Sequence, residues 1–158
     1  MDTSKRIPPE REACFPNLLA GGYEKTSPDE CFYNCFAWAA GEENTSDWWN
    51  PFCLGSGYYW PEGLDRKADV KTFVRLYEIN GGYIPCESAE PEHGFEKIAI
   101  YIGADNEVTH AARQLPDGTW TSKLGGWEDI RHKTLEGLCG DDPAYGRVAQ
   151  IVKRPRKQ

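Results

Sequence analysis

The residues of this chain best suited to nucleophilic chemistry are its six cysteines and three histidines. Cys35 stands out by position, because it follows Asn34, a residue type that caps helix N-termini, and precedes Gly41, a residue type that ends helices. Cys35 is therefore expected in the first turn of a helix. There the unpaired backbone amides and the helix dipole stabilise a thiolate, so Cys35 is the candidate nucleophile.

The small number of histidines narrows the choice of a general base for this thiol. His93 lies in a polar connector, and His132 follows Glu-Asp-Ile-Arg in a stretch typical of a surface turn or short helix, so both are expected to be solvated. His110 instead lies within a predicted strand and is followed by two alanines, and a rigid strand suits a general base. The alternative is a sheet histidine whose ring is satisfied by a backbone carbonyl.

A hairpin signal next to His110 suggests a third member of the site. The sequence LPDG at residues 115–118 predicts a tight turn. If Leu115 pairs with Thr119, Ser122 lies on the same sheet face as His110, one diagonal step away. Ser122 could therefore orient the imidazole. Asp129 competes for this role, since a carboxylate stabilises an imidazolium better than a hydroxyl does.

Cys35, His110 and Ser122 together predict acyl transfer through a thioester. His110 would take the thiol proton, Cys35 would attack an amide carbonyl, and water would hydrolyse the thioester. The expected substrate is a peptide, an isopeptide or a side-chain amide. A transferase or a deamidase would show the same residues.

Two other kinds of site compete with this interpretation. Cys31 and Cys35 are four residues apart, but no Cys-x-x-Cys and no His-x-x-x-His accompanies them, so neither a metal nor another cofactor is expected. The stronger rival is a catalytically inactive binding module. In that case the aromatic-rich loop over residues 42–61 would hold a peptide or a partner protein, because aromatic side chains are common anchors.

The elements that must position these residues change in character along the chain. The pattern predicts a helix from about Asn34 and an amphipathic helix over residues 68–79. Period-two segments then predict strands at residues 82–86, 95–102, 107–114, 119–124 and 146–152. Helices followed by strands predict an α+β domain. We expect one domain over residues 29–153, an extended surface segment over residues 1–28, and a basic, solvated tail over residues 154–158.

Composition limits the classes of partner. The net charge of −7 argues against nucleic acid, and no apolar run approaches the roughly 20 residues needed to span a bilayer. Without a signal-peptide pattern, the cysteines are expected to be free thiols in a cytoplasmic protein. Delivery by a specialised secretion machine would leave no such pattern. A protein delivered in that way as a toxin would be accompanied by a neutralising partner.

Three segments resemble known cysteine amidases. The sequence YNCFAWA at residues 33–39 resembles the helix-start cysteine motif of the papain-like superfamily, particularly its NlpC and CHAP branches, and KIAIYIG at residues 97–103 is similar to their following strand. The stretch THAARQLPDGTWTSKLG at residues 109–125 resembles an uncharacterised group of small bacterial proteins that combine it with an Asn-Cys-x-Ala-Trp-Ala motif. Together the similar segments span about residues 31–150.

The resemblance implies a papain-like α+β fold, with an N-terminal helix carrying Cys35 packed on an antiparallel sheet. It also implies an oxyanion hole built from the Cys35 amide and a second donor. Asp29 stands where papain has its glutamine donor, and Asn34 is a candidate substitute. NlpC enzymes often place their histidine near the position of Glu96 or Lys97, so here His110 would supply the base from the next strand.

Overall fold

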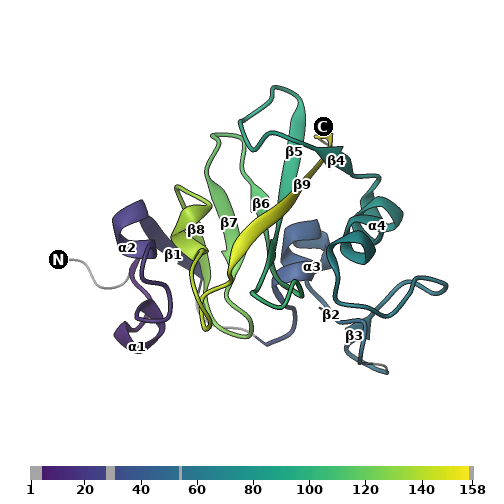
Figure 1. The fold of residues 1–158 in the computed structure, drawn as a ribbon, viewed down its shortest axis with the longest axis horizontal. Coiled ribbons are helices and arrows are strands. Elements are labelled where there is room, and N and C mark those ends of the chain that lie inside the picture. The colour runs from purple at the N-terminus through teal and green to yellow at the C-terminus, as the bar shows by residue number, and fades with distance from the viewer. Residues whose placement is uncertain (1–4, 28–30, 54, 157–158) are drawn as a thin grey trace.

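The structure is a computed structural model that describes residues 5–27, 31–53 and 55–156. Within these residues, seven strands form one antiparallel sheet (Figure 1). The strands lie in the order β1 (Tyr23–Ser27), β8 (Asp129–His132), β7 (Trp120–Lys123), β6 (Val108–Gln114), β5 (Phe95–Ile102), β9 (Arg147–Pro155) and β4 (Ile84–Cys86). A separate short parallel pair joins β2 (Trp48–Trp49) to β3 (Tyr58–Tyr59).

Two helices follow the sequence pattern closely. Helix α3 (Cys35–Ala40) begins after Asn34, whose side chain accepts a hydrogen bond from the Ala37 amide at 3.2 Å. Helix α4 (Val70–Gly81) is capped by Asp69 in the same way. The remaining helical pieces are single turns: α1 (Pro9–Glu12), α2 (Leu18–Gly21), η2 (Glu42–Asn44) and η3 (Glu136–Leu138).

The sheet buries both of its faces. Alternate residues of β5 belong to different hydrophobic clusters, with Ile98 and Ile100 in one and Ala99 and Tyr101 in the other, as the pleat requires. The first cluster contains residues of α3, α4 and the aromatic loop, and the second contains residues of the N-terminal segment and of η3. Figure 1 shows α1 and α2 at the opposite end of the molecule from α4 and the β2–β3 pair.

The expectation of a papain-like α+β fold, with an N-terminal helix packed on an antiparallel sheet, is wrong. The architecture of the described residues is mostly the seven-stranded antiparallel sheet, and its helices are few and short. Helix α3 has only six residues and is followed by the single turn η2 and then by β2, not by a helical half-domain. The aromatic loop, predicted as a loop, contributes to the core directly, with Trp49 and Trp60 buried.

Both ends of the chain contribute more to the sheet and its hydrophobic core than their composition indicates. The N-terminal segment, expected to be extended over the surface, forms α1, α2 and β1, and it buries Phe15 and Leu18 against the sheet. Pro9 starts α1 because its fixed φ suits the first helical position. At the other end β9 continues to Pro155, and buried Arg154 pairs with buried Glu96 at 2.6 Å. The basic tail thus begins inside the sheet.

The predicted hairpin is confirmed. The Leu115 amide donates to the Thr119 carbonyl at 2.7 Å, and Gly118 takes the positive φ of 90° that the turn needs. Arg113 then pairs with Thr121, the register counted from the sequence. Each of the five expected strands is present, with bounds shifted by a few residues at most.

Asn34 links the start of α3 to the aromatic loop, so its removal should destabilise the whole site. Its side chain caps α3, accepts from the Trp49 amide at 3.2 Å and donates to the Trp49 carbonyl at 2.9 Å. Asn34→Ala should lower the free energy of unfolding by about 2–4 kcal/mol, because the cap is lost and buried polar groups of Trp49 lose partners. Urea unfolding monitored by tryptophan fluorescence measures this.

The matched control is Asn17→Ala. Asn17 also occupies an N-cap position, but it is exposed, and its side chain makes no capping bond and donates only one exposed hydrogen bond, to the Cys139 carbonyl at 3.1 Å. Its replacement should change the unfolding free energy by about 0.5 kcal/mol or less. Equal effects of the two substitutions would contradict the structural role given to Asn34.

Candidate functional site

The site is built around a row of buried polar groups on one face of the sheet. His110 on β6 is fully buried, and its Nε2 lies 2.9 Å from Ser122 Oγ on β7. Ser122 Oγ also lies 2.7 Å from His132 Nε2 on β8, and His132 Nδ1 lies 2.9 Å from the Thr134 carbonyl oxygen. The four groups form a continuous hydrogen-bonded chain across three neighbouring strands. Ser122 therefore takes the place beside His110 that the register predicted.

The chain of polar groups ends at an unsatisfied atom. Among the described residues His110 Nδ1 has no hydrogen-bond partner, although it is buried. The ring is fixed by aromatic neighbours, since Tyr145 stacks on it with centroids 4.1 Å apart and Tyr101 meets it edge-on at 5.4 Å. The imidazole thus has one nitrogen held by Ser122 and one nitrogen available for chemistry.

Both histidines are held neutral by their surroundings. Burial lowers the pKa of His132 to about 4, against a smaller opposing effect of its bond to Thr134. Burial also lowers the pKa of His110 well below its usual value, and a charge on His132 would lower it further. At neutral pH each ring therefore carries one proton and offers one lone pair.

Cys35 occupies the first turn of α3, as the sequence predicts, and is only 6% exposed. Burial raises the pKa of its thiol to about 12, and hydrogen bonds from the backbone amides of Ala111, Phe36 and Cys35 itself oppose that rise. The expected low pKa at a helix N-terminus is therefore absent in this state. The sulfur is a thiol at neutral pH, surrounded by three amides that favour negative charge once it forms.

The backbone of β6 connects Cys35 with His110. Helix α3 lies against β6 and β7, and these two strands pair at Arg113–Thr121 and Gln114–Trp120. Among the described residues no further pairing of β6 with β7 follows these pairs, and the backbone of Ala111 lies near enough to Cys35 to lower the pKa of its thiol. Cys35 also raises the pKa of Tyr145, the ring stacked on His110, although burial is the larger cause. The thiol thus lies beside the strand residue that follows His110.

Asp129, the competing third member, is placed elsewhere. It is buried at the end of β8, where its Oδ2 accepts hydrogen bonds from Ser27 at 2.7 Å and Tyr33 at 2.8 Å. Its Oδ1 lies 3.7 Å from the Lys123 ammonium. Asp129 therefore balances a buried lysine and anchors β1, while Ser122 is the residue that touches His110.

The two oxyanion-hole candidates from the resemblance are Asn34 and Asp29. The side chain of Asn34 is occupied by Trp49 and by the start of α3, so it is not free to donate to a substrate. Asp29 lies outside the described residues. The backbone amides near Cys35 remain the donors of the site.

The sequence reasoning missed His132. It was expected on the surface, yet it is 1% exposed and lies on β8. The signal that could have identified it is the alternation of Ile130 and His132, which puts both on the buried face opposite Ser122 and Trp120. His93, in contrast, is exposed as expected.

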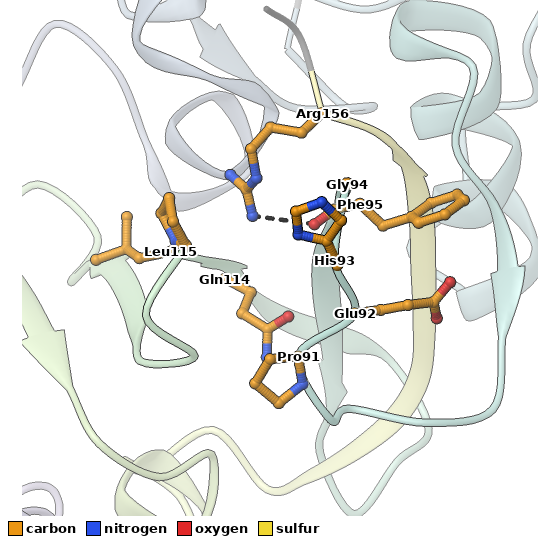
Figure 2. A pocket seen from close by; sticks show the side chains of 9 residues that line it. Pro91, Glu92, His93, Gly94, Phe95, Gln114, Leu115 and Arg156 are labelled. Atoms are coloured by element: carbon orange, nitrogen blue, oxygen red, sulfur yellow. Dashed lines mark hydrogen bonds between the residues drawn. The ribbon is translucent and has the colours of Figure 1, made fainter.

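A cavity of about 760 Å³ lies next to the His110 region, because Thr109 of β6 and the two neighbours of Tyr145, Ala144 and Gly146, are among the residues that line it. Another, of about 620 Å³, lies between residues 91–95, the hairpin turn at 114–116 and Arg156. Figure 2 shows the ring of His93 beside Arg156, which donates to the Phe95 carbonyl at 3.0 Å. Arg156 also pairs with Glu96 at 3.6 Å, so its charge is already compensated. A further cavity, of about 430 Å³, lies beside Cys31, Phe32, Trp48 and Tyr58.

Glu96 and Lys97, the positions aligned with the histidine of NlpC enzymes, have structural partners. Glu96 pairs with Arg154, and the buried ammonium of Lys97 donates to the carbonyls of Ser88 at 2.7 Å and Glu90 at 2.8 Å. These contacts tie β5 to β9 and to the connector before β5. Both side chains are therefore occupied by structural contacts.

Sheet and site together define an antiparallel β-sheet protein with a buried histidine–serine–histidine chain next to a helix-start thiol. The family model described as a domain of unknown function, DUF7689, matches residues 24–153, and the chain belongs to this family. No curated protein and no solved structure matches the chain. The family match makes no link to papain-like, NlpC or CHAP enzymes, so functional arguments rest on the geometry of the site.

Within the described part of the chain, no helix is both long and apolar enough to cross a bilayer.

The two buried histidines should make the fold sensitive to mild acid. The pKa of His132 is about 4 in the fold and about 6.5 in the unfolded chain, so below pH 6.5 the unfolded state binds the extra proton. Stability is therefore full above that pH and is lost as the pH falls. Between pH 7 and pH 5.5 we expect a loss of about 1 kcal/mol from His132, with His110 adding to it.

Urea unfolding curves at the two pH values measure this loss. His93→Gln is the matched control and should show the same loss as the wild type, because His93 is exposed. An unfolding free energy that does not change between pH 7 and pH 5.5 would contradict the buried neutral state of His132.

Proposed function

We propose that this chain is a cysteine hydrolase that cleaves an amide bond, with Cys35 as nucleophile and His110 as general base. The observation that carries the proposal is the free Nδ1 of His110, which has no partner among the described residues while Ser122 holds Nε2. A sheet histidine with a purely structural role is expected to satisfy both buried nitrogens. Ala111, the next residue on β6, lies near Cys35, and among the described residues no hydrogen bond joins the Cys35 sulfur to His110 before substrate binds.

The protonation states favour a neutral pair over a preformed thiolate–imidazolium pair. Because burial raises the pKa of Cys35 and lowers that of His110, the resting site holds a thiol and a neutral imidazole. The proton moves from sulfur to His110 Nδ1 as Sγ bonds to the substrate carbonyl carbon. Hydrogen bonds of this kind are often long before substrate binds and tighten in the complex.

The remaining steps use the same two residues. His110 returns the proton to the leaving amine as the C–N bond breaks, and a thioester remains on Cys35. Water then gives its proton to His110 and attacks the thioester, so a carboxylic acid leaves and the thiol re-forms. The backbone of Ala111 and of Phe36, which lowers the pKa of the Cys35 thiol, favours the negative charge that develops there.

The limited access to the Cys35 sulfur favours a narrow substrate. Cys35 is 6% exposed and His110 is fully buried, so a bulky folded surface cannot reach the pair. The class of substrate that we propose is a side-chain amide, an isopeptide or an extended peptide. We propose that the enzyme acts in the cytoplasm. A neutralising partner belongs to the proposal only if the protein is delivered as a toxin. We propose no nucleic acid or membrane partner.

A second candidate function is supported by the aromatic loop. Phe32, which is 67% exposed, and Tyr58, which is 44% exposed, line the 430 Å³ cavity, and Phe52 of the same loop is also 67% exposed. Residues 31–65 contain no lysine, arginine or histidine but five acidic residues. An exposed aromatic and acidic surface suits a basic peptide through cation–π and charge contacts. In this alternative the protein is an inactive binding module, and Cys35 has no special reactivity.

Acyl transfer from p-nitrophenyl acetate tests the first candidate without knowledge of the natural substrate. We expect mass spectrometry to show that Cys35 is acetylated faster than any exposed thiol of the protein. His110→Gln, which removes the base, should slow the acetylation of Cys35 by a factor of about 100 or more. Cys35→Ala should abolish nitrophenol release in turnover.

Cys31→Ser is the matched control for this experiment. Cys31 is exposed and lies four residues before Cys35 in the sequence, outside helix α3, so its loss should leave acetylation of Cys35 unchanged. Acetylation of Cys35 at the same rate in His110→Gln and in the wild type would reject the hydrolase and favour the binding module. Near-native circular dichroism of each variant shows that the fold is retained.

A further inference from the structure

The direction of every hydrogen bond in the His110–Ser122–His132 chain follows from its far end. A backbone carbonyl can only accept, so His132 Nδ1 must donate to Thr134 over the 2.9 Å that separates them. His132 is neutral, because burial lowers its pKa to about 4, and its single ring proton is therefore on Nδ1. The Nε2 of His132 is left with a lone pair that faces Ser122.

The proton of Ser122 is then assigned as well. Its hydroxyl has one proton and donates it to His132 Nε2 at 2.7 Å. The Ser122 oxygen can only accept from His110, whose Nε2 must carry the ring proton at 2.9 Å. His110 Nδ1 is thus the bare nitrogen, which is the state that a general base requires.

We propose that His132 is a positioning residue that, through Ser122, fixes the tautomer in which His110 Nδ1 can accept the Cys35 proton. This inference rests on the proposed function. The reverse arrangement would put the lone pair of His132 Nδ1 against the lone pairs of the Thr134 carbonyl, so the chain has one favoured direction. A buried donor or acceptor left without a partner destabilises the reverse arrangement enough to select one tautomer about tenfold.

Two observations separate this role from simple satisfaction of buried polar groups. A purely structural chain would close at both ends, whereas this one closes at Thr134 and, among the described residues, stays open at His110 Nδ1. The ring planes are also fixed, because Tyr145 stacks on His110 with parallel rings. Neither Ser122 nor His132 is exposed, so water does not reach the chain to reverse it.

The test is a measurement of the His110 tautomer by ¹⁵N NMR of histidine-labelled protein at neutral pH. The nitrogen shifts distinguish a protonated from an unprotonated ring nitrogen. In the wild type we expect a protonated Nε2 and a bare Nδ1. In His132→Phe the Ser122 hydroxyl is free to donate to His110 Nε2, so the fraction of the Nδ1–H tautomer should rise from about one-tenth or less to about one half.

Two further variants keep the test decisive if His132→Phe does not fold. Ser122→Ala removes the link and should also abolish the tautomer preference. His132→Gln offers a side-chain carbonyl that can accept from Ser122 and should restore it. Wild-type tautomer populations in both His132→Phe and Ser122→Ala, or a wild-type His110 protonated on Nδ1, would overturn the proposal.

Acetyl transfer separates this inference from the proposed function. Loss of the tautomer preference in His132→Phe leaves about half of His110 in the competent tautomer, so the rate constant for acetylation of Cys35 should fall about twofold, with KM little changed. A shifted tautomer with an unchanged rate would overturn the positioning role. If the wild type transfers no acetyl group, the proposed function fails, while the tautomer measurement still decides the direction of the chain.

Discussion

The imidazole of His110 is held away from water, and a ring in that position must remain neutral and find partners for its nitrogens within the protein. Ser122 supplies one partner, and the need to satisfy Ser122 in turn draws in His132 and Thr134. The strands β6, β7 and β8 must keep their register for these contacts to exist. The buried histidine therefore couples the sheet to the proposed chemistry, and a shift of register would break both.

Local signals in the sequence predicted the parts of the site that are close together along the chain. The LPDG turn set the pairing of Arg113 with Thr121, which placed Ser122 beside His110. Asn34 and Gly41 predicted the bounds of α3, and with them the position of Cys35. Turn and cap geometry depend on a few neighbouring residues, and for this reason such features can be read from a single sequence.

Features that depend on distant contacts were not predictable in the same way. His132 is buried because β1, from the N-terminal segment, pairs with β8 and closes that edge of the sheet. The papain-like fold was inferred from a short helix motif, but the aromatic loop builds its part of the core without helices. The raised pKa of Cys35 likewise comes from tertiary burial, which overrides the effect of the helix N-terminus.

The pH dependence of Cys35 acetylation by p-nitrophenyl acetate tests the neutral thiol–imidazole pair most directly. The account predicts a rate that is constant from pH 6.5 to pH 8.5, because the base is already neutral and the thiol, with a pKa of about 12, does not ionise in this range. A rate that rises about tenfold per pH unit and does not depend on His110 would show an ordinary thiolate reaction and would contradict the account.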